Sequence, residues 1–280
     1  MKLLRHGPSG SEKPGLMHTD GTIRDLSGFV PDIAGAVISD TGLAMLRAID
    51  ASTLPIVDAS TRLGPCVAGT GKFICIGLNY ADHAAESGMA VPPEPVIFMK
   101  ATSAICGPND PIIIPRTSQK TDWEVELAVI IGKKAKYVSE ADALSYVAGY
   151  AVTNDVSERA FQTERAGQWT KGKSCDNFGQ IGPWLVTRDE VADPQSLSMW
   201  LKVNGESKQN GSTKTMVYGA AFVVAYLSQF MTLHPGDVIS TGTPPGVGMG
   251  MKPQKFLKAG DVVELGIAGL GSQRQDVIAD

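Results

Sequence analysis

Residues 121–131, TDWEVELAVII, carry apolar side chains at every second position. Trp123 and Val125 begin this apolar face, and Glu124 and Glu126 lie on the opposite face. A period of two with aromatic and β-branched residues predicts a strand that turns one face toward a hydrophobic core. The two glutamates would then stand roughly 6.5–7 Å apart along the same side of the strand.

Paired carboxylates at this spacing indicate a metal site. Two like charges so close raise each other's pKa unless a cation lies between them, and hard divalent cations prefer carboxylate oxygens. Asp155 follows an expected strand at residues 150–154 and would supply a third carboxylate from the end of that strand. Two alternatives stay open, namely a solvated E-x-E face and an Asp155 that caps a helix over residues 155–165.

A candidate general base lies in residues 79–88, NYADHAAESG, which predict a short helix after a buried strand at residues 73–78. His83 and Glu86 are three residues apart, so they share a helix face. A carboxylate that orients an imidazole is the usual way to build a general base, although a surface ion pair fits the same spacing. The proline-rich residues 91–95 end this helix, so the segment could act as a movable lid.

The composition predicts a soluble cytoplasmic protein with a sizeable core. The chain has 280 residues, of which 43% are hydrophobic, and its formal net charge is −4. No basic block and no apolar run near the roughly 20 residues of a membrane helix occur, so neither nucleic acid nor a membrane is expected as a partner. The four cysteines form no C-x-x-C pair, which argues against zinc and for reduced thiols.

The expected strands outnumber the expected helices and mostly lie 8–20 residues apart. This pattern predicts an α+β, mostly β fold, with a mixed β sandwich or roll as the main domain at residues 70–280 and a small N-terminal domain at residues 1–65. Asn204-Gly205 after an alternating stretch is a strong hairpin signal within the main domain.

One nucleotide-binding motif is rejected. Residues 167–174, GQWTKGKS, match G-x-x-x-x-G-K-S, but that loop requires a buried strand before it and a helix after it. A polar helical stretch precedes the match and a glycine-rich segment follows it. Lys173 remains of interest as a cation that follows a turn.

Six ordered segments form one combined pattern: FICIGLNYADHAAE (73–86), PVIFMKATSAICGPNDPIIIP (95–115), TDWEVELAVIIGKKAKYV (121–138), YAVTNDVSERAFQ (150–162), KGKSCDNFGQIGPW (171–184) and GDVISTGTPPGVG (236–248). Taken together, they resemble the fumarylacetoacetate hydrolase family, and the resemblance covers about residues 70–280. The details are closer to bacterial members of the ureidoglycolate lyase and 2,4-diketo-3-deoxy-L-fuconate hydrolase type than to the mammalian tyrosine-degrading enzyme.

This resemblance implies a homodimer of mixed β-sandwich rolls and a set of site residues. The implied metal ligands for Mg²⁺ or Mn²⁺ are Glu124, Glu126 and Asp155, with Asp122 outside the ligand set and either behind it or facing solvent. The implied catalytic residues are His83, Glu86 and Lys173, and the implied substrate-binding residues are Lys100, Gln162 and Thr243.

The implied activity is hydrolysis of a C–C bond in a small 2,4-dioxo acid, either an acylpyruvate or a 2,4-diketo-3-deoxy sugar acid. The metal would polarise the 2-oxo acid and stabilise the enolate that leaves, while His83 activates the attacking water. Three alternatives stay open: a ureidoglycolate lyase, an oxaloacetate decarboxylase and a non-catalytic homologue that binds metal.

Overall fold

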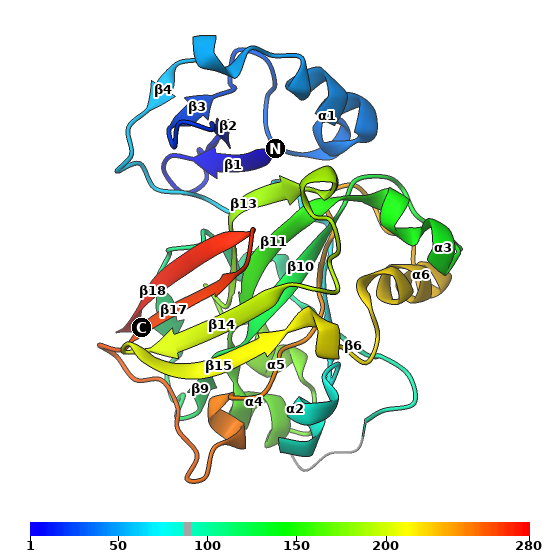
Figure 1. The fold of residues 1–280 in the computed structure, drawn as a ribbon. Helices are drawn as coiled ribbons and strands as arrows, with labels where there is room; N and C mark the ends of the chain where they lie inside the picture. The colour runs from blue at the N-terminus through cyan, green and yellow to red at the C-terminus, as the bar shows by residue number, and fades with distance from the viewer. Residues whose placement is uncertain (87–90) are drawn as a thin grey trace.

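The computed structural model spans residues 1–280, and the structure describes residues 1–86 and 91–280, with the side chains of residues 83–85 excepted. Two sheets pack face to face, and helices lie at the edges and at one end of the resulting sandwich (Figure 1). The predicted α+β, mostly β sandwich fold is therefore confirmed.

The larger sheet has eleven strands within the described residues, in the order β4-β3-β2-β1-β13-β11-β10-β16-β5-β6, with β7 paired to β13. It mixes antiparallel pairs with the parallel pairs β16–β5 and β13–β7. Its strands are β1 (Lys2–His6), β2 (Lys13–Met17), β3 (Ile23–Asp25), β4 (Ile56–Val57), β5 (Phe73–Gly77), β6 (Val96–Lys100), β7 (Ile105–Cys106), β10 (Val125–Ile131), β11 (Val147–Asp155), β13 (Gly179–Thr187) and β16 (Val238–Ser240).

The second sheet has the order β15-β14-β17-β18-β8, and a short pair joins β9 to β12. The strands are β8 (Ile112–Ile114), β9 (Thr121–Asp122), β12 (Ser157–Glu158), β14 (Ser198–Val203), β15 (Glu206–Ser212), β17 (Val262–Ile267) and β18 (Gly271–Ala279). The α-helices are α1 (Asp40–Arg47), α2 (Ala81–Glu86), α3 (Glu140–Ala143), α4 (Arg159–Thr163), α5 (Thr170–Lys173) and α6 (Ala220–Phe230).

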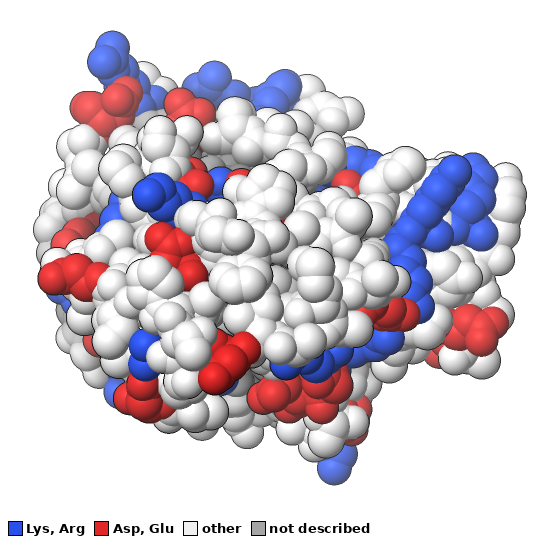
Figure 2. Space-filling model, turned by 90° about the horizontal axis from the view of Figure 1, so that it is seen from above, with Lys and Arg blue, Asp and Glu red and all other residues white. Residues whose placement is uncertain are grey.

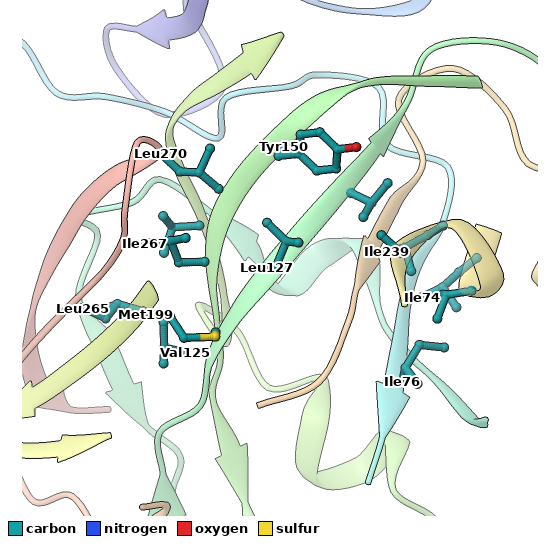
Figure 3. Close-up of a cluster of buried hydrophobic side chains, with 14 of the residues drawn as sticks. Ile74, Ile76, Val125, Leu127, Tyr150, Met199, Ile239, Leu265, Ile267 and Leu270 are labelled. Carbon is teal, nitrogen blue, oxygen red and sulfur yellow. The ribbon is translucent and has the colours of Figure 1, made fainter. Parts of the chain in front are cut away.

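The core lies between the two sheets, and residues 121–131 supply its centre. Val125 and Leu127 of β10 lie near Met199 of β14 and Leu265 of β17, and all four side chains are buried (Figure 3). The predicted core-facing side of this strand is confirmed, and the alternative of a solvated E-x-E face is wrong. Its other face is also covered, because Ala128 belongs to a second buried cluster that includes residues of the N-terminal segment.

The stretch 121–131 is also not one continuous strand. It divides into β9 and β10, and the backbone amides next to the break donate to side chains. Glu124 N donates to Asn154 Oδ1 at 3.1 Å, and Val125 N donates to Gln209 Oε1 at 2.9 Å. These side-chain acceptors satisfy the amides that the ladder would otherwise pair.

The N-terminal segment continues the larger sheet, because β1 pairs with β13 through Leu3 and Leu185. Figure 1 shows its four strands and α1 above the rest of the molecule. Helix α1 begins directly after Ser39, whose Oγ accepts from Gly42 N at 3.2 Å and caps the helix. The division into a domain of residues 1–65 and a domain of residues 70–280 stays a prediction.

Two other local predictions had different outcomes. The Asn204-Gly205 hairpin is confirmed, with β14 and β15 antiparallel and both turn residues at positive φ (52° and 78°). The helix over residues 155–165 is wrong in extent. Asp155 ends β11, β12 follows, and α4 begins only at Arg159, because backbone pairing with β9 keeps the intervening residues extended.

The described residues contain no helix that combines the length and the apolar character needed to cross a membrane. Figure 2 views the molecule from above, the side on which the N-terminal segment lies in Figure 1. Acidic and basic side chains on this face are interspersed among wide uncharged areas. That face therefore shows no broad field of one sign.

Truncation of the core at β10 tests this packing. Leu127→Ala removes a fully buried side chain and should lower the free energy of unfolding by about 2–5 kcal/mol, measured by denaturant titration. Ile56→Ala serves as the control, because Ile56 is 64% exposed, and it should change stability by less than about 1 kcal/mol. Equal losses in the two variants would contradict the assignment of the core.

Candidate active site

Three carboxylates meet where β10 and β11 lie side by side. Glu124 stands just before β10, Glu126 lies within it, and Asp155 is the last residue of β11. The antiparallel register pairs Glu126 with Thr153. It therefore places the start of β10, which carries the glutamates, beside the end of β11, which carries Asp155. One oxygen from each carboxylate lies within 4.8 Å of the others, and all three residues are buried.

Two lysines partly neutralise these carboxylates. Lys173 Nζ donates to Glu124 Oε2 at 2.6 Å and to Asp155 Oδ2 at 2.7 Å. Lys100 pairs with the other oxygen of Asp155 and donates to Val156 O at 2.9 Å. Burial alone would lower the pKa of Lys173, but Asp155 and Glu124 raise the pKa overall, so the ammonium stays charged at neutral pH.

Arg159 is a site residue that the sequence analysis missed. Its Nη2 donates to Glu124 Oε1 at 2.7 Å, and its Nε donates to Asp122 Oδ2 at 2.8 Å. The sequence offered one signal for it, namely its place four residues after Asp155 and three before Gln162, both of them predicted site residues. The helix expected over residues 155–165 gave no reason to single it out.

Asp122 lies behind the carboxylate cluster and does not face solvent. It is 0% exposed, and besides Arg159 it accepts from Gly248 N at 2.7 Å and Met249 N at 3.0 Å. The alternative of a solvent-facing Asp122 is therefore wrong, because the charge of Arg159 and two loop amides compensate for the burial of its carboxylate.

Glu126 differs from its neighbours, because the described residues give it hydrogen bonds only from uncharged donors. Its carboxylate accepts from the Ser240 hydroxyl and from Gly242 N at 2.8 Å. Burial, together with the charges of Asp155 and Glu124, raises the pKa of Glu126 well above its usual value. Three hard oxygen donors with one incompletely compensated charge fit Mg²⁺ or Mn²⁺.

A pocket of about 160 Å³ opens beside these carboxylates. Its lining includes the charged residues Glu124, Glu126, Arg159 and Lys173 and several apolar side chains. Among the apolar residues, Trp169 and Phe98 meet edge to face, with ring centroids 5.3 Å apart. The pocket thus combines a few charged groups with apolar side chains, as sites for small molecules commonly do.

The predicted substrate-binding residues lie at or near this pocket. Gln162 lines it, and its Oε1 accepts from Arg159 Nη1 at 3.1 Å. Thr243 also lines it, but its hydroxyl donates to Val125 O at 2.9 Å and accepts from Gln209. Lys100 lies beneath Asp155 and is not among the residues that line the pocket.

The predicted general-base pair lies in α2. The side chain of His83 falls outside the described residues, so its distance to Glu86 stays a prediction. Glu86 accepts from Gly246 N at 3.0 Å, which joins α2 to the glycine-rich residues 242–250.

The nucleotide-binding motif that was rejected, residues 167–174, lies wholly within the described residues. The helix α4 precedes the match and the helix α5 lies within it, which differs from the strand–loop–helix order that the motif requires.

Comparison with known proteins identifies the family. The model of the fumarylacetoacetate (FAA) hydrolase C-terminal domain matches residues 72–278. The chain belongs to the fumarylacetoacetate hydrolase family. A Burkholderia orbicola protein with a provisional hydrolase name is 67% identical over 276 residues, covering 98% of each chain. This confirms the resemblance at the level of the family, whose members are enzymes.

Two solved structures of this family are similar over the whole chain. The 2-hydroxyhepta-2,4-diene-1,7-dioate isomerase of Mycobacterium marinum is 33% identical, with a TM-score of 0.77 over 100% of this chain and 99% of its own. The maleylpyruvate hydrolase of Sphingobium sp. SYK-6, in complex with manganese(II) and pyruvate, is 30% identical, with a TM-score of 0.83 over 100% and 99%.

Metal addition tests the carboxylate cluster without an activity assay. Mn²⁺ at about 100 times its dissociation constant should stabilise the chelator-treated protein by about 2.7 kcal/mol, measured as a rise in melting temperature. Glu126→Gln should abolish that rise without destabilising the metal-free protein, because it removes a buried charge whose pKa is raised. Glu206→Gln, at an exposed position, should respond to metal like the unmodified protein. A normal response in Glu126→Gln would remove Glu126 from the ligand set.

The buried pair of Asp122 and Arg159 makes a separate prediction. Asp122→Asn should lower the free energy of unfolding by about 3 kcal/mol, because it leaves a buried guanidinium undercompensated. Asp276→Asn breaks a surface pair with Arg274 and should cost less than about 1 kcal/mol. Denaturant titration measures the free energy of unfolding of both variants. A loss in Asp122→Asn as small as that in Asp276→Asn would contradict the role of the Asp122 charge in compensating Arg159.

Proposed function

We propose that this protein is a divalent-metal-dependent hydrolase that cleaves a C–C bond in a small 2,4-dioxo acid of the acylpyruvate type. The observation that carries the proposal is the buried cluster of Glu124, Glu126 and Asp155 beside a small pocket. The manganese and pyruvate in the maleylpyruvate hydrolase complex support it, because pyruvate is the product that acylpyruvate hydrolysis releases.

Each polar residue then has a role. A bound metal ion supplies Lewis-acid catalysis to a 2-oxo acid. Lys173 bridges Glu124 and Asp155 and keeps positive charge beside the pocket where negative charge develops. Gln162, whose amide oxygen is fixed by Arg159, positions the substrate.

His83, oriented by Glu86, takes a proton from the attacking water at an imidazole nitrogen. The water oxygen adds to the distal carbonyl carbon, and the bond between that carbon and the methylene group breaks. The methylene carbon of the pyruvate fragment finally takes up a proton, so the products are pyruvate and the carboxylic acid of the acyl group.

Several details of this proposal remain predictions. The metal is Mg²⁺ or Mn²⁺, the chain forms a homodimer, and the substrate is a small oxo acid. Ureidoglycolate cleavage and oxaloacetate decarboxylation use the same metal site, and a non-catalytic homologue would keep the cluster without turnover.

A substrate panel tests the proposal. Chelator-treated protein is restored with Mg²⁺ or Mn²⁺ and assayed on acylpyruvates, oxaloacetate, a 2,4-diketo-3-deoxy sugar acid and ureidoglycolate. We expect metal-dependent turnover that is highest on an acylpyruvate. Turnover of another compound alone would reassign the reaction, and no turnover of any would refute the hydrolase assignment.

Replacement of the general base gives a sharper test. His83→Ala should lower kcat by about 10²–10⁴-fold, the usual contribution of general-base catalysis, and leave the metal-induced rise in melting temperature unchanged. His234→Ala is the matched control, because His234 is exposed at a turn far along the chain. Unchanged turnover in His83→Ala would exclude His83 as the base.

A further inference from the structure

Four of the residues that line the pocket are apolar and form a surface called here the apolar wall: Leu78, Phe98, Trp169 and Met249. All four side chains are half-buried, so they still have apolar surface to cover. Trp169 lies directly over Gly77, where an added Cβ would stand 2.6 Å from its Cζ3. The indole of Trp169 is therefore packed closely against the end of β5, which fixes this part of the wall.

The cations beside this wall are already matched by carboxylates. Lys173 bonds to Glu124 and Asp155, and its remaining side faces the Phe98 ring, whose centroid is 5.0 Å from Nζ. Arg159 is paired with Asp122 and Glu124. Among the described residues that line the pocket, no cation is left without a carboxylate partner to receive a second acid group of the substrate.

The threonine hydroxyl groups that line the pocket already donate hydrogen bonds to backbone carbonyl groups. Thr243 Oγ1 donates to Val125 O at 2.9 Å, and Thr163 Oγ1 donates to Arg159 O at 2.9 Å. A polyhydroxylated acyl chain would therefore lose its hydrogen bonds to water and gain few from these side chains, which is costly on burial. The whole pocket has a volume of about 160 Å³, close to that of a cavity that holds benzene, so the 2-oxo acid part of the substrate leaves room only for a short acyl chain.

From this wall we infer that the acyl group of the substrate is short, uncharged and apolar, a small alkyl chain in place of a carboxylate-bearing or sugar-derived chain. The inference rests on the proposed function and narrows its substrate class. It also separates this chain from the isomerase relative, whose name gives its substrate as a 1,7-dioate.

A matched pair of substrates tests the inference. 2,4-Dioxoheptanoate and 2,4-dioxoheptanedioate have the same carbon chain and differ only in a terminal methyl or carboxylate. With Mn²⁺-loaded protein, we expect kcat/KM to be at least tenfold higher for the monoacid, because the diacid must bury a charge against the apolar wall. Equal values, or a preference for the diacid, would overturn the inference.

A change in the wall should change this selectivity. Met249→Lys places a cation in the wall and should reduce the preference for the monoacid at least tenfold, whereas Met249→Leu should keep it. If Met249→Lys folds but leaves the ratio of the two kcat/KM values unchanged, Met249 does not contribute to the surface that contacts the acyl group, and the wall as defined is wrong.

Binding without turnover separates this inference from the proposed function. Isothermal titration calorimetry on the Mn²⁺-loaded protein compares 2-oxopentanoate with 2-oxoglutarate, which again differ in a terminal methyl or carboxylate. At least tenfold tighter binding of 2-oxopentanoate supports the wall even if no dioxo acid is cleaved. Tighter or equal binding of 2-oxoglutarate, or no binding of either acid, overturns the inference even if acylpyruvates are cleaved.

Discussion

Compensation of buried negative charge is the constraint on which the site depends. The two oxygens of Glu124 receive different cations, Arg159 on Oε1 and Lys173 on Oε2. Both cations come from the chain that follows β11, so the ion pairs hold α4 and α5 over the carboxylates. Backbone contact is close there, since a Cβ at Gly172 would lie 2.3 Å from Glu158 O. Breaking such pairs would leave uncompensated charges in a low-dielectric interior.

Three other carboxylates at or near the site also position the glycine-rich residues 242–250. Amides of this loop donate to Glu126 from Gly242, to Asp122 from Gly248 and to Glu86 from Gly246. The acceptors come from β10, β9 and α2, so the loop is held by three separate elements. Because the loop contributes Thr243 and Met249 to the pocket, the geometry that compensates the buried charges also shapes the substrate site.

The carboxylates and the apolar wall of the pocket come from different kinds of structure. The carboxylates stand on neighbouring strands, whose register a sheet fixes firmly. The apolar side chains stand on β6, on the segment before α5 and on loops. Loop positions vary more readily than paired strands, so the apolar wall is the part of the pocket that can change most easily without moving the carboxylates.

The sequence by itself determined what depends on neighbours in the chain. The period of two at residues 121–131 gave the apolar face at Val125 and Leu127, and Asn204-Gly205 gave the hairpin. The ordered segments identified the family, and through it the three carboxylates that the structure brings together.

Only the tertiary structure decided what depends on distant partners. Arg159 pairs with Asp122, 37 residues away, and Ala128 is covered by a cluster that includes the N-terminal segment. The helix expected from Asp155 gave way to pairing with β9. Side-chain periodicity reports which face a residue occupies, but burial and charge pairing depend on which other segment covers that face.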